Sequence, residues 1–400
     1  MWVRIAFLPV PTLHIPSVAH QQQHRTLLGL LHCGCLILSS ATQGQRTINM
    51  DMACRISAVD VRQMTVNYNV RKIGKIGIPL FFFFLLFTAV AVDVSVASTI
   101  VVSKTSPACT SGDDYFTSIQ VAVDKANDGD DIIVCPGTYM ENIEVDKSVS
   151  IRSDGRAADT VIEAKNIDDN IINITTNNVD ISDFTIRNTE ANGIYLDAVV
   201  GCNLSGNNIY STQNGIRLFF SDRNQIYLNT ANLNNNSGIS LEDSNNNLIS
   251  NNIANSKQCN GIELNLSNNN IIIENNASNN LQCGIFLWES NNNIIRGNRA
   301  NSNKLRFGIT LYSSDSNYII GNNASCNFYN GISLVFSTNN TIRDNIATSN
   351  KYSSGMELHG SWNNDILNNN ISYNFETGIR LFDSNGNIIG GNIVKLNVCV

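Results

Sequence analysis

Charged residues are scarce in this 400-residue chain. Asp, Glu, Lys and Arg together make up 15% of the sequence, and the formal net charge is −7. Proteins that bind nucleic acids gather Lys and Arg against the phosphates, and proteins attracted to a membrane surface carry polybasic segments. The scarcity of charge therefore argues against a nucleic-acid partner and against a polybasic membrane contact.

This low charge does not indicate disorder. Disordered chains combine high charge with few β-branched residues, whereas Ile is abundant and evenly spaced here. Apolar residues make up 42% of the sequence, which is ample for a packed core. Asn, Ser and Thr supply the polar surface instead of ionic groups.

A secretory signal is predicted for residues 64–97. It starts at Met64 and contains a basic stretch at 71–75, an apolar run at 76–92 and a small-residue cleavage site at 95–97. The apolar run is near the lower length limit of a spanning helix, so an uncleaved signal anchor is the alternative. Residues 1–63 do not fit a signal and are interpreted as a mis-assigned start or, alternatively, a cytoplasmic tail. We expect an extracellular protein whose one membrane contact would be that anchor.

One short motif, Gly-apolar-x-Leu, recurs nine times between residue 193 and residue 400. Neighbouring copies begin 22 to 24 residues apart. The copies begin at Gly193, Gly215, Gly238, Gly261, Gly284, Gly308, Gly331, Gly355 and Gly378. In eight of the nine, Ser follows three residues after the Leu, Asn six after and Ile eight after. A fixed period of this length is the signature of a solenoid.

The spacing within each copy predicts strands. Apolar residues at i and i+2 follow the strand period, and the residue between them points outward. Three short strands and their turns fit into about 23 residues, and successive coils then pair in parallel about 4.8 Å apart. The predicted fold is all-β, a right-handed single-stranded parallel β-helix. A leucine-rich repeat is disfavoured, because it needs several Leu per repeat.

Asn recurs at two fixed positions of the coil. Asn tolerates the left-handed region and bonds nearby backbone, and stacked Asn side chains can bond along a solenoid as a ladder. We interpret both columns as structural, with ligand binding as the minor alternative. The columns are Asn224, Asn247, Asn270, Asn293, Asn317, Asn340, Asn364 and Asn387, then Asn229, Asn252, Asn275, Asn298, Asn322, Asn345, Asn369 and Asn392.

Residues 98–192 are predicted to hold a cap and irregular first coils, before nine regular coils at 193–400. Helical spacing over 115–127, with Thr117 or Ser118 as its cap, predicts a short helix that covers the open end of the solenoid. The motif that follows contains Gly129, Asp130, Pro136, Gly137, Tyr139 and Glu141. This opening and the Asn-rich coils resemble the pectate-lyase-like superfamily, in particular the NosD-type β-helix, also called the carbohydrate-binding and sugar-hydrolase (CASH) repeat.

The resemblance covers about residues 98–400 and implies the fold better than the activity. It implies a surface protein, a polysaccharide lyase, hydrolase or epimerase, or a copper-delivery protein. Copper sites need clustered His, Met or Cys, and after residue 97 the sequence has a single histidine, His359, with Met356 nearby. Copper delivery is therefore disfavoured and no metal site is predicted. Calcium is not indicated either, since no Asp-rich nonapeptide repeat is present.

An enzymatic interpretation needs paired carboxyl groups, which hydrolases place about 5–10 Å apart. The candidates on adjacent coils are Glu242, Asp243, Glu263 and Glu289. Solvated surface acids are the simpler explanation. The sequence also lacks the Gly-His-Gly of polygalacturonases and a lyase-type Arg among clustered Asp. An enzyme is therefore the second interpretation.

The preferred interpretation of the sequence is a carbohydrate-binding surface. The outward residue after each motif Leu is often aromatic, and exposed rings beside acids can stack on sugars. The candidates are Phe219, Trp288, Tyr312, His359 and Phe382. The alternative is that a loop or a neighbouring chain packs on this face. We predict a non-catalytic, secreted or cell-surface β-helix, without a cofactor, that binds a polysaccharide or surface glycan or forms part of a surface layer.

Several further expectations concern modification and assembly. Disulfides are considered between Cys109 and Cys135 and between Cys259 and Cys283. The last coil ends without a polar cap, so we expect a truncated C-terminus or end-to-end or lateral self-association. Sequons for N-glycosylation occur at Asn173, Asn203, Asn235, Asn265, Asn276, Asn323, Asn339 and Asn370, some of them expected by chance in a sequence so rich in Asn and Ser.

Overall fold

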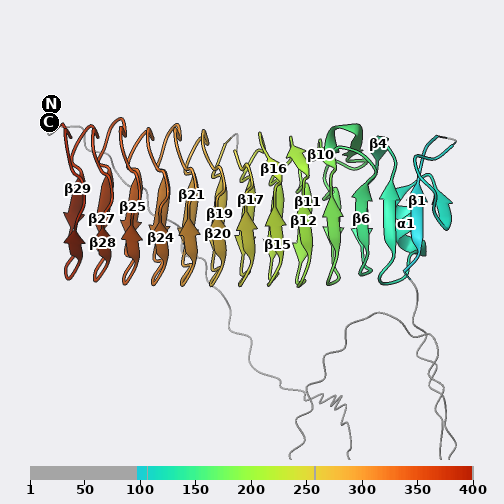
Figure 1. Cartoon of the computed structure of the whole chain (residues 1–400), viewed down its shortest axis with the longest axis horizontal. Helices are drawn as coiled ribbons and strands as arrows, with labels where there is room; N and C mark the ends of the chain where they lie inside the picture. Colours follow the sequence, from blue (N-terminus) through green and yellow to red (C-terminus); the bar gives the residue numbers. More distant parts are fainter. Residues whose placement is uncertain (1–96, 106, 256–257, 399–400) are drawn as a thin grey trace, which may run out of the picture. The chain divides into compact units, whose positions relative to one another are not determined.

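A computed structural model describes residues 97–105, 107–255 and 258–398. They form a right-handed parallel β-solenoid of about 11 turns with almost no helix, which confirms the predicted fold. Figure 1 shows the coils stacked along the long axis. The predicted extension and signal segment, apart from Ala97, lie outside the described residues. Within the described part, no helix has the length and apolar character needed to cross a membrane.

Each side of the coil contributes one parallel sheet, named here A, B and C. Sheet A contains β2 (Asp114–Phe116), β1 (Thr99–Val102), β3 (Asp131–Val134), β6 (Ser150–Ser153), β9 (Asp180–Ser182), β12 (Asn203–Ser205), β15 (Gln225–Tyr227), β18 (Leu248–Ser250), β20 (Ile271–Ile273), β22 (Ile294–Arg296), β24 (Tyr318–Ile320), β26 (Thr341–Arg343), β28 (Asp365–Leu367) and β30 (Ile388–Gly390). Sheet B contains β4 (Gly137–Met140), β7 (Thr160–Glu163), β10 (Thr185–Arg187), β13 (Asn208–Tyr210) and β16 (Thr230–Ala231). Sheet C contains β5 (Ile143–Val145), β8 (Ile172–Ile174), β11 (Ile194–Asp197), β14 (Ile216–Phe219), β17 (Ile239–Glu242), β19 (Ile262–Asn265), β21 (Ile285–Trp288), β23 (Ile309–Tyr312), β25 (Ile332–Val335), β27 (Met356–His359) and β29 (Ile379–Phe382).

The third side of the coil is shorter than the sequence predicted. Beyond β16, sheet B continues as isolated parallel bridges of one residue per coil. The buried residues Asn275 and Asn280 are separated there by four residues, and one of these, Asn279, has a left-handed backbone (φ 62°). No room is left for a longer strand. The regular coils from Gly238 onward therefore have two strands and a bridge, whereas the first two regular coils have the three strands that the sequence predicted.

The Gly-apolar-x-Leu motif forms the strands of sheet C and supplies most of the core. In one coil, Ile285 and Leu287 from sheet C meet Ile295 from sheet A and Ala300 from the third side, all fully buried. The motif glycine is required because the backbones of neighbouring coils approach each other closely at this position. A Cβ on Gly284 would lie 2.7 Å from the Ala300 Cβ and 2.7 Å from the Gly308 carbonyl oxygen. Any larger residue would therefore push neighbouring coils apart.

Buried Asn side chains connect each coil to the next at the corners. The Asn270 backbone N–H donates to Asn293 Oδ1 (2.8 Å), while Asn270 Nδ2 donates to the Ser244 carbonyl (3.0 Å) of the preceding coil. The second column repeats this geometry, with Asn275 N–H donating to Asn298 Oδ1 (2.8 Å). A third column, which was not predicted, lies at the remaining corner, where the Asn280 N–H donates to Asn303 Oδ1 (3.0 Å) and later coils repeat this contact. Its members are Asn234, Asn280, Asn303, Asn327, Asn350, Asn374 and Asn397.

The buried Asn residues of these columns do not themselves have a left-handed backbone; their neighbours in the sequence do. The residue immediately before each Asn of the first column has the positive φ, as at Asn246 (60°), Asn269 (58°) and Asn292 (58°). The expected reason for the buried Asn was therefore wrong in part. The buried Asn is selected for its hydrogen bonds, and its exposed neighbour is selected for its backbone conformation.

The cap helix is shorter than predicted. Helix α1 spans Ile119–Lys125, and Tyr115 lies instead in β2, where it pairs with Val101 of β1. Ile119, Ala122 and Val123 of α1 are buried in the core at that end of the solenoid. Ser118 caps the helix, as one of the two expected residues. A short 3₁₀ turn, η1 (Ala157–Asp159), precedes β7.

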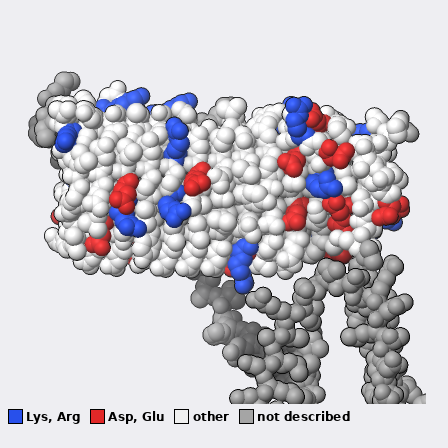
Figure 2. Space-filling model, viewed as in Figure 1, with Lys and Arg blue, Asp and Glu red and all other residues white. Residues whose placement is uncertain are grey.

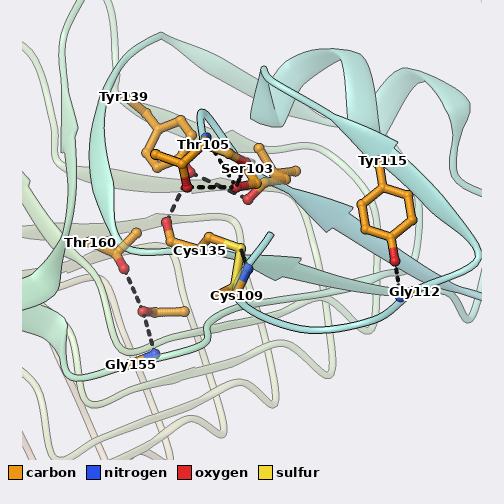
Figure 3. Close-up of a disulfide and its surroundings, with 11 residues drawn as sticks. Ser103, Thr105, Cys109, Gly112, Tyr115, Cys135, Tyr139, Gly155 and Thr160 are labelled. Carbon is orange, nitrogen blue, oxygen red and sulfur yellow. Dashed lines mark hydrogen bonds between the residues drawn. A yellow bond between two sulfur atoms is a disulfide. The ribbon is translucent and has the colours of Figure 1, made fainter. Parts of the chain in front are cut away.

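Two residues of the opening motif, Tyr139 and Glu141, make hydrogen bonds within the fold. Glu141 accepts hydrogen bonds from Ser118 Oγ (2.8 Å) and from the Gln120 N–H (2.9 Å), so it holds the start of α1. Burial raises the pKa of Tyr139 to about 12, with a further contribution from Glu141. The Tyr139 hydroxyl donates to the Cys135 carbonyl (2.9 Å), next to the disulfide (Figure 3). No catalytic role is needed to explain this motif.

One of the two predicted disulfides is present in the structure. Cys109 and Cys135 form a disulfide with their Cα atoms 5.5 Å apart (Figure 3). Cys283 is not disulfide-bonded, so the Cys259–Cys283 pairing is wrong. The Cys283 thiol is buried beside the Thr310 hydroxyl at 3.8 Å, and burial raises its pKa to about 11.

Replacing a buried corner Asn tests the role of these columns. Asn298→Ala would remove the acceptor of the Asn275 N–H and the donor to the Ile272 carbonyl. Because buried groups left unpaired each cost about 1–3 kcal/mol, we expect the free energy of unfolding to fall by about 3 kcal/mol. Denaturant unfolding measures this loss. The control is Asn292→Gly at an exposed left-handed position, for which we expect a change below about 0.5 kcal/mol. Equal effects of the two substitutions would contradict the assigned role.

Asp130 predicts a pH-dependent contribution to stability. Burial opposes its ionisation, but hydrogen bonds from the Ser98 and Asn127 amides (both 2.8 Å) lower the pKa of Asp130 below its usual value. A lowered pKa in the folded state stabilises the protein above the unfolded-state pKa of about 3.9, and the contribution is lost as pH falls through the folded-state value. Asp130→Asn should therefore destabilise the protein at pH 7 and have less effect below about pH 4.

Denaturant unfolding at neutral and acidic pH measures that difference. Asp146→Asn, at an exposed carboxylate, is the control and should show no comparable dependence. An Asp130→Asn effect that is the same at both pH values would contradict the ionised, hydrogen-bonded state.

Candidate functional site

The predicted carbohydrate-binding residues lie in one row on the outer face of sheet C. Each is the last residue of its strand, and the strands pair in register, so Trp288 lies beside Tyr312 and His359 beside Phe382. The complete row is Asp197, Phe219, Glu242, Asn265, Trp288, Tyr312, Val335, His359 and Phe382. Trp288, Tyr312 and Phe382 are each 39–49% exposed. The structure therefore brings all five aromatic or imidazole candidates onto one surface.

The N-terminal part of the row is held by local contacts. Phe219 stacks on Tyr195 with ring centroids 6.5 Å apart, and the Arg217 guanidinium lies 5.8 Å from the Phe219 centroid. Arg217 also forms an ion pair with Glu242 (2.5 Å). Burial raises the pKa of Tyr195, and the nearby Asp197 carboxylate adds to the effect. The side chains in this part of the row therefore contact one another through ring stacking and an ion pair.

The C-terminal part is a continuous aromatic surface. His359 stacks on Phe382 with centroids 4.8 Å apart. Phe336, one residue beyond the row, contacts His359 edge-on at 5.7 Å and Tyr312 edge-on at 6.0 Å. Phe336 has a left-handed backbone (φ 49°), which turns its side chain out at the corner after β25, and it is 51% exposed.

A groove of about 410 Å³ lies beside this aromatic surface. Phe336 and His359 form one wall, and Phe307 and Tyr329, whose ring centroids are 5.9 Å apart, form the other. Its remaining lining is mostly polar: Asn330, Ser333, Val335, Ser353 and Glu357. Asn330 Nδ2 donates to Glu357 Oε2 (3.2 Å) within it. The volume is in the range of small-ligand sites.

The second wall of the groove was not predicted from the sequence. Phe307 directly precedes the motif Gly308, and Tyr329 comes two residues before Gly331. The aromatic contacts continue along this side of the coil through Phe328 and Tyr352, with centroids 4.6 Å apart. The signal was present as aromatics shortly before the motif glycine. Their spacing varies by one residue between coils, so they did not align as a column.

The predicted catalytic acids do not gather in the groove. Glu242 forms an ion pair with Arg217. Glu263 accepts hydrogen bonds from Ser237 Oγ (2.6 Å) and Asn260 Nδ2 (3.3 Å). Asp243 and Glu289 occupy equivalent left-handed corner positions two coils apart (φ 46° and 47°). Their catalytic role stays a prediction. Among the residues that line the groove, Glu357 is the one carboxylate.

Charge is sparse on the surface as well as in the sequence. The face drawn in Figure 2 carries small separate groups of acidic and basic side chains on a largely uncharged surface. Among the ion pairs of the described residues, Arg187 and Glu163 lie 2.6 Å apart. That face presents no broad basic area of the kind that binds phosphates.

The described residues do not fit a copper site. They contain no cluster of three His, Cys, Asp or Glu side chains that could hold a metal ion. Met356 and His359 also point to opposite sides of β27, since Met356 is fully buried in the core while His359 faces outward between Phe336 and Phe382. Two soft ligands that face apart cannot share one ion.

Comparisons with known proteins agree with the fold. The family model described as "Right handed beta helix region" matches residues 170–325, and that described as "Periplasmic copper-binding protein (NosD)" matches residues 282–399. A cell surface glycoprotein of Methanothermus fervidus is 44% identical over 96 residues, which are 24% of this chain and 16% of the glycoprotein. The A-module of the Azotobacter vinelandii mannuronan C-5 epimerase AlgE6 superposes with a TM-score of 0.53 at 16% identity, covering 69% of this chain and 93% of the module.

The coils and these matches define a right-handed β-helix repeat protein. Within that class, parts of the chain resemble the NosD family and the right-handed β-helix family, whose models match the ranges given above. The likeness to the epimerase module concerns the fold alone, because the identity is low.

Proposed function

We propose that this protein is a non-catalytic cell-surface β-helix that binds a glycan on the outer face of sheet C. The groove between Phe336 and His359 on one side and Phe307 and Tyr329 on the other carries the proposal. The aromatic row that includes Trp288, Tyr312 and Phe382 extends the binding surface along the solenoid.

The chemistry of the groove suits a sugar ring. A pyranose has an apolar face that packs on aromatic rings and a polar edge that needs hydrogen-bond partners. The two aromatic walls provide rings for the apolar face of the sugar. Asn330, Ser333 and Glu357 provide hydrogen-bond partners for its polar edge. Coils repeat about every 4.8 Å, so a long glycan can contact several coils in succession.

The cell-surface location rests on the relative from Methanothermus fervidus, which is named a cell surface glycoprotein. The chain spans 16% of that relative, so a role shared by the two whole proteins does not follow. The predicted signal at 64–97 supports the same location from the sequence. Lateral or end-to-end self-association stays a prediction.

A polysaccharide lyase, hydrolase or epimerase is the second candidate. The observation in its favour is that the Glu357 carboxylate lies between the aromatic walls. Acid–base hydrolysis of a glycoside generally uses two carboxyl groups, and the groove lining offers one. For this reason we favour binding over turnover.

Glycan-array binding by the full-length protein tests this proposal. Phe336→Ala and Tyr329→Ala should each weaken binding about tenfold or more, since burial of an aromatic ring on a ligand contributes about 1.5–3 kcal/mol. The matched control is Tyr318→Ala. Tyr318 is an aromatic residue of similar exposure (49%), but it lies on the outer face of sheet A. Its loss should leave binding unchanged.

The glycans that bind should also be incubated with the protein and assayed for reducing ends and unsaturated products. Binding without product supports the binding proposal. Product that disappears in Glu357→Gln would establish the enzyme instead. Failure to bind any glycan, or equal effects of Tyr318→Ala and Phe336→Ala, would contradict the proposed site.

A further inference from the structure

The third side of the coil carries an ordered pattern that glycan binding on sheet C does not explain. Its outward bridge residues form one column: Thr230, Ile253, Asn276, Arg299, Asn323, Ile346, Asn370 and Ile393. From Asn276 onward, Asn occupies alternate coils, and successive members are 47 positions apart in the sequence. Each of these Asn begins a sequon, since Ser278, Ser325 and Ser372 follow two residues later.

We propose that Asn276, Asn323 and Asn370 form a row of N-linked glycosylation sites on the third side of the solenoid. The middle residue of each sequon is buried in the core: Ala277, Ala324 or Ile371. Because side chains alternate along an extended chain, the Asn before it faces outward. All three Asn retain partial exposure.

The alternation of the pattern has a steric consequence. Adjacent coils are about 4.8 Å apart, which is too close for a bulky glycan on each. Sites on every second coil are separated by about 10 Å. The coils between them carry Arg299 and Ile346 in the same column, and neither begins a sequon. The spacing therefore leaves room for a glycan at every site.

Within the described part of the chain, the side chains of these three Asn make no hydrogen bond, and their Oδ1 atoms are buried without a partner. Asn173 Oδ1 is buried without a partner too, but two other sequon residues differ from the three at Nδ2. Asn173 Nδ2 donates to Glu144 Oε2 (2.6 Å), and Asn203 Nδ2 donates to Asp180 Oδ1 (2.8 Å). A glycan on either would break an existing contact.

The reaction requires a lipid-pyrophosphate-linked oligosaccharide as co-substrate and a membrane transferase. The Asn Nδ2 forms a bond to the anomeric carbon, the bond from that carbon to the phosphate oxygen breaks, and its electron pair leaves with the lipid pyrophosphate. The amide nitrogen loses one proton to a base of the transferase. Ser278 and Ser372 are buried in the folded coil. Transfer must therefore precede packing of the coil, and the fold then has to accommodate the sugar.

Glycopeptide mass spectrometry of the protein isolated from its natural producer tests the proposal, and it does not depend on the folding of any variant. We expect glycan on the peptides that contain Asn276, Asn323 and Asn370, and unmodified Asn173 and Asn203. In the same host, Asn323→Gln should lower the intact mass by one glycan. The control Asn203→Gln should lower it by none.

Several outcomes would overturn this proposal. These are unmodified peptides at the three row positions, modification of Asn173 and Asn203 in their place, or an intact mass that equals the sequence mass. A glycan-array result on sheet C bears on none of them, so the two proposals can fail separately.

Discussion

The solenoid depends on pairing the backbone amides at its corners. Where the chain leaves one sheet and enters the next, its N–H and C=O groups are buried but cannot all join a sheet, and an unpaired buried group costs about 1–3 kcal/mol. Asn solves this because one side chain offers both an acceptor and a donor. Asn293 accepts from the Asn270 N–H in the coil before it and donates through Nδ2 to the Ser267 carbonyl. The same acceptor contact recurs in the following coils, as between Asn293 N–H and Asn317 Oδ1 and between Asn317 N–H and Asn340 Oδ1.

This arrangement leaves the outward positions free to vary. Packing favours Ile, Leu and Ala at most inward positions of the regular coils. The motif glycine is required because neighbouring coils leave no space for a Cβ. The outward residues of sheet C, sheet A and the third side are constrained only by the strand, so each side can carry its own chemistry. Aromatic rings gather on sheet C, as at Trp288 and Tyr312, whereas the third side carries the alternating Asn residues. The scarcity of charge follows, since ion pairs are not needed to hold the coils.

The sequence predicted the coil because its constraints are strictly periodic. Gly284, Ile285, Leu287 and Asn293 recur at the same offsets in almost every repeat, and the structure places each as the spacing requires. Features without a strict offset were missed. The groove wall of Phe307 and Tyr329 shifts by one residue between coils. Pairing of Tyr115 with β1 shortened the cap helix, because a tertiary contact overrode the local helical pattern.

Site-resolved amide hydrogen exchange by NMR on the unmodified sequence tests the central claim most directly. The account predicts that the backbone amides of Asn247, Asn270 and Asn293, which lie in corners and outside the strands, exchange as slowly as the amides of neighbouring strands. Exchange of these amides at the rate of an exposed turn would contradict the claim that Asn side chains hold the coils together.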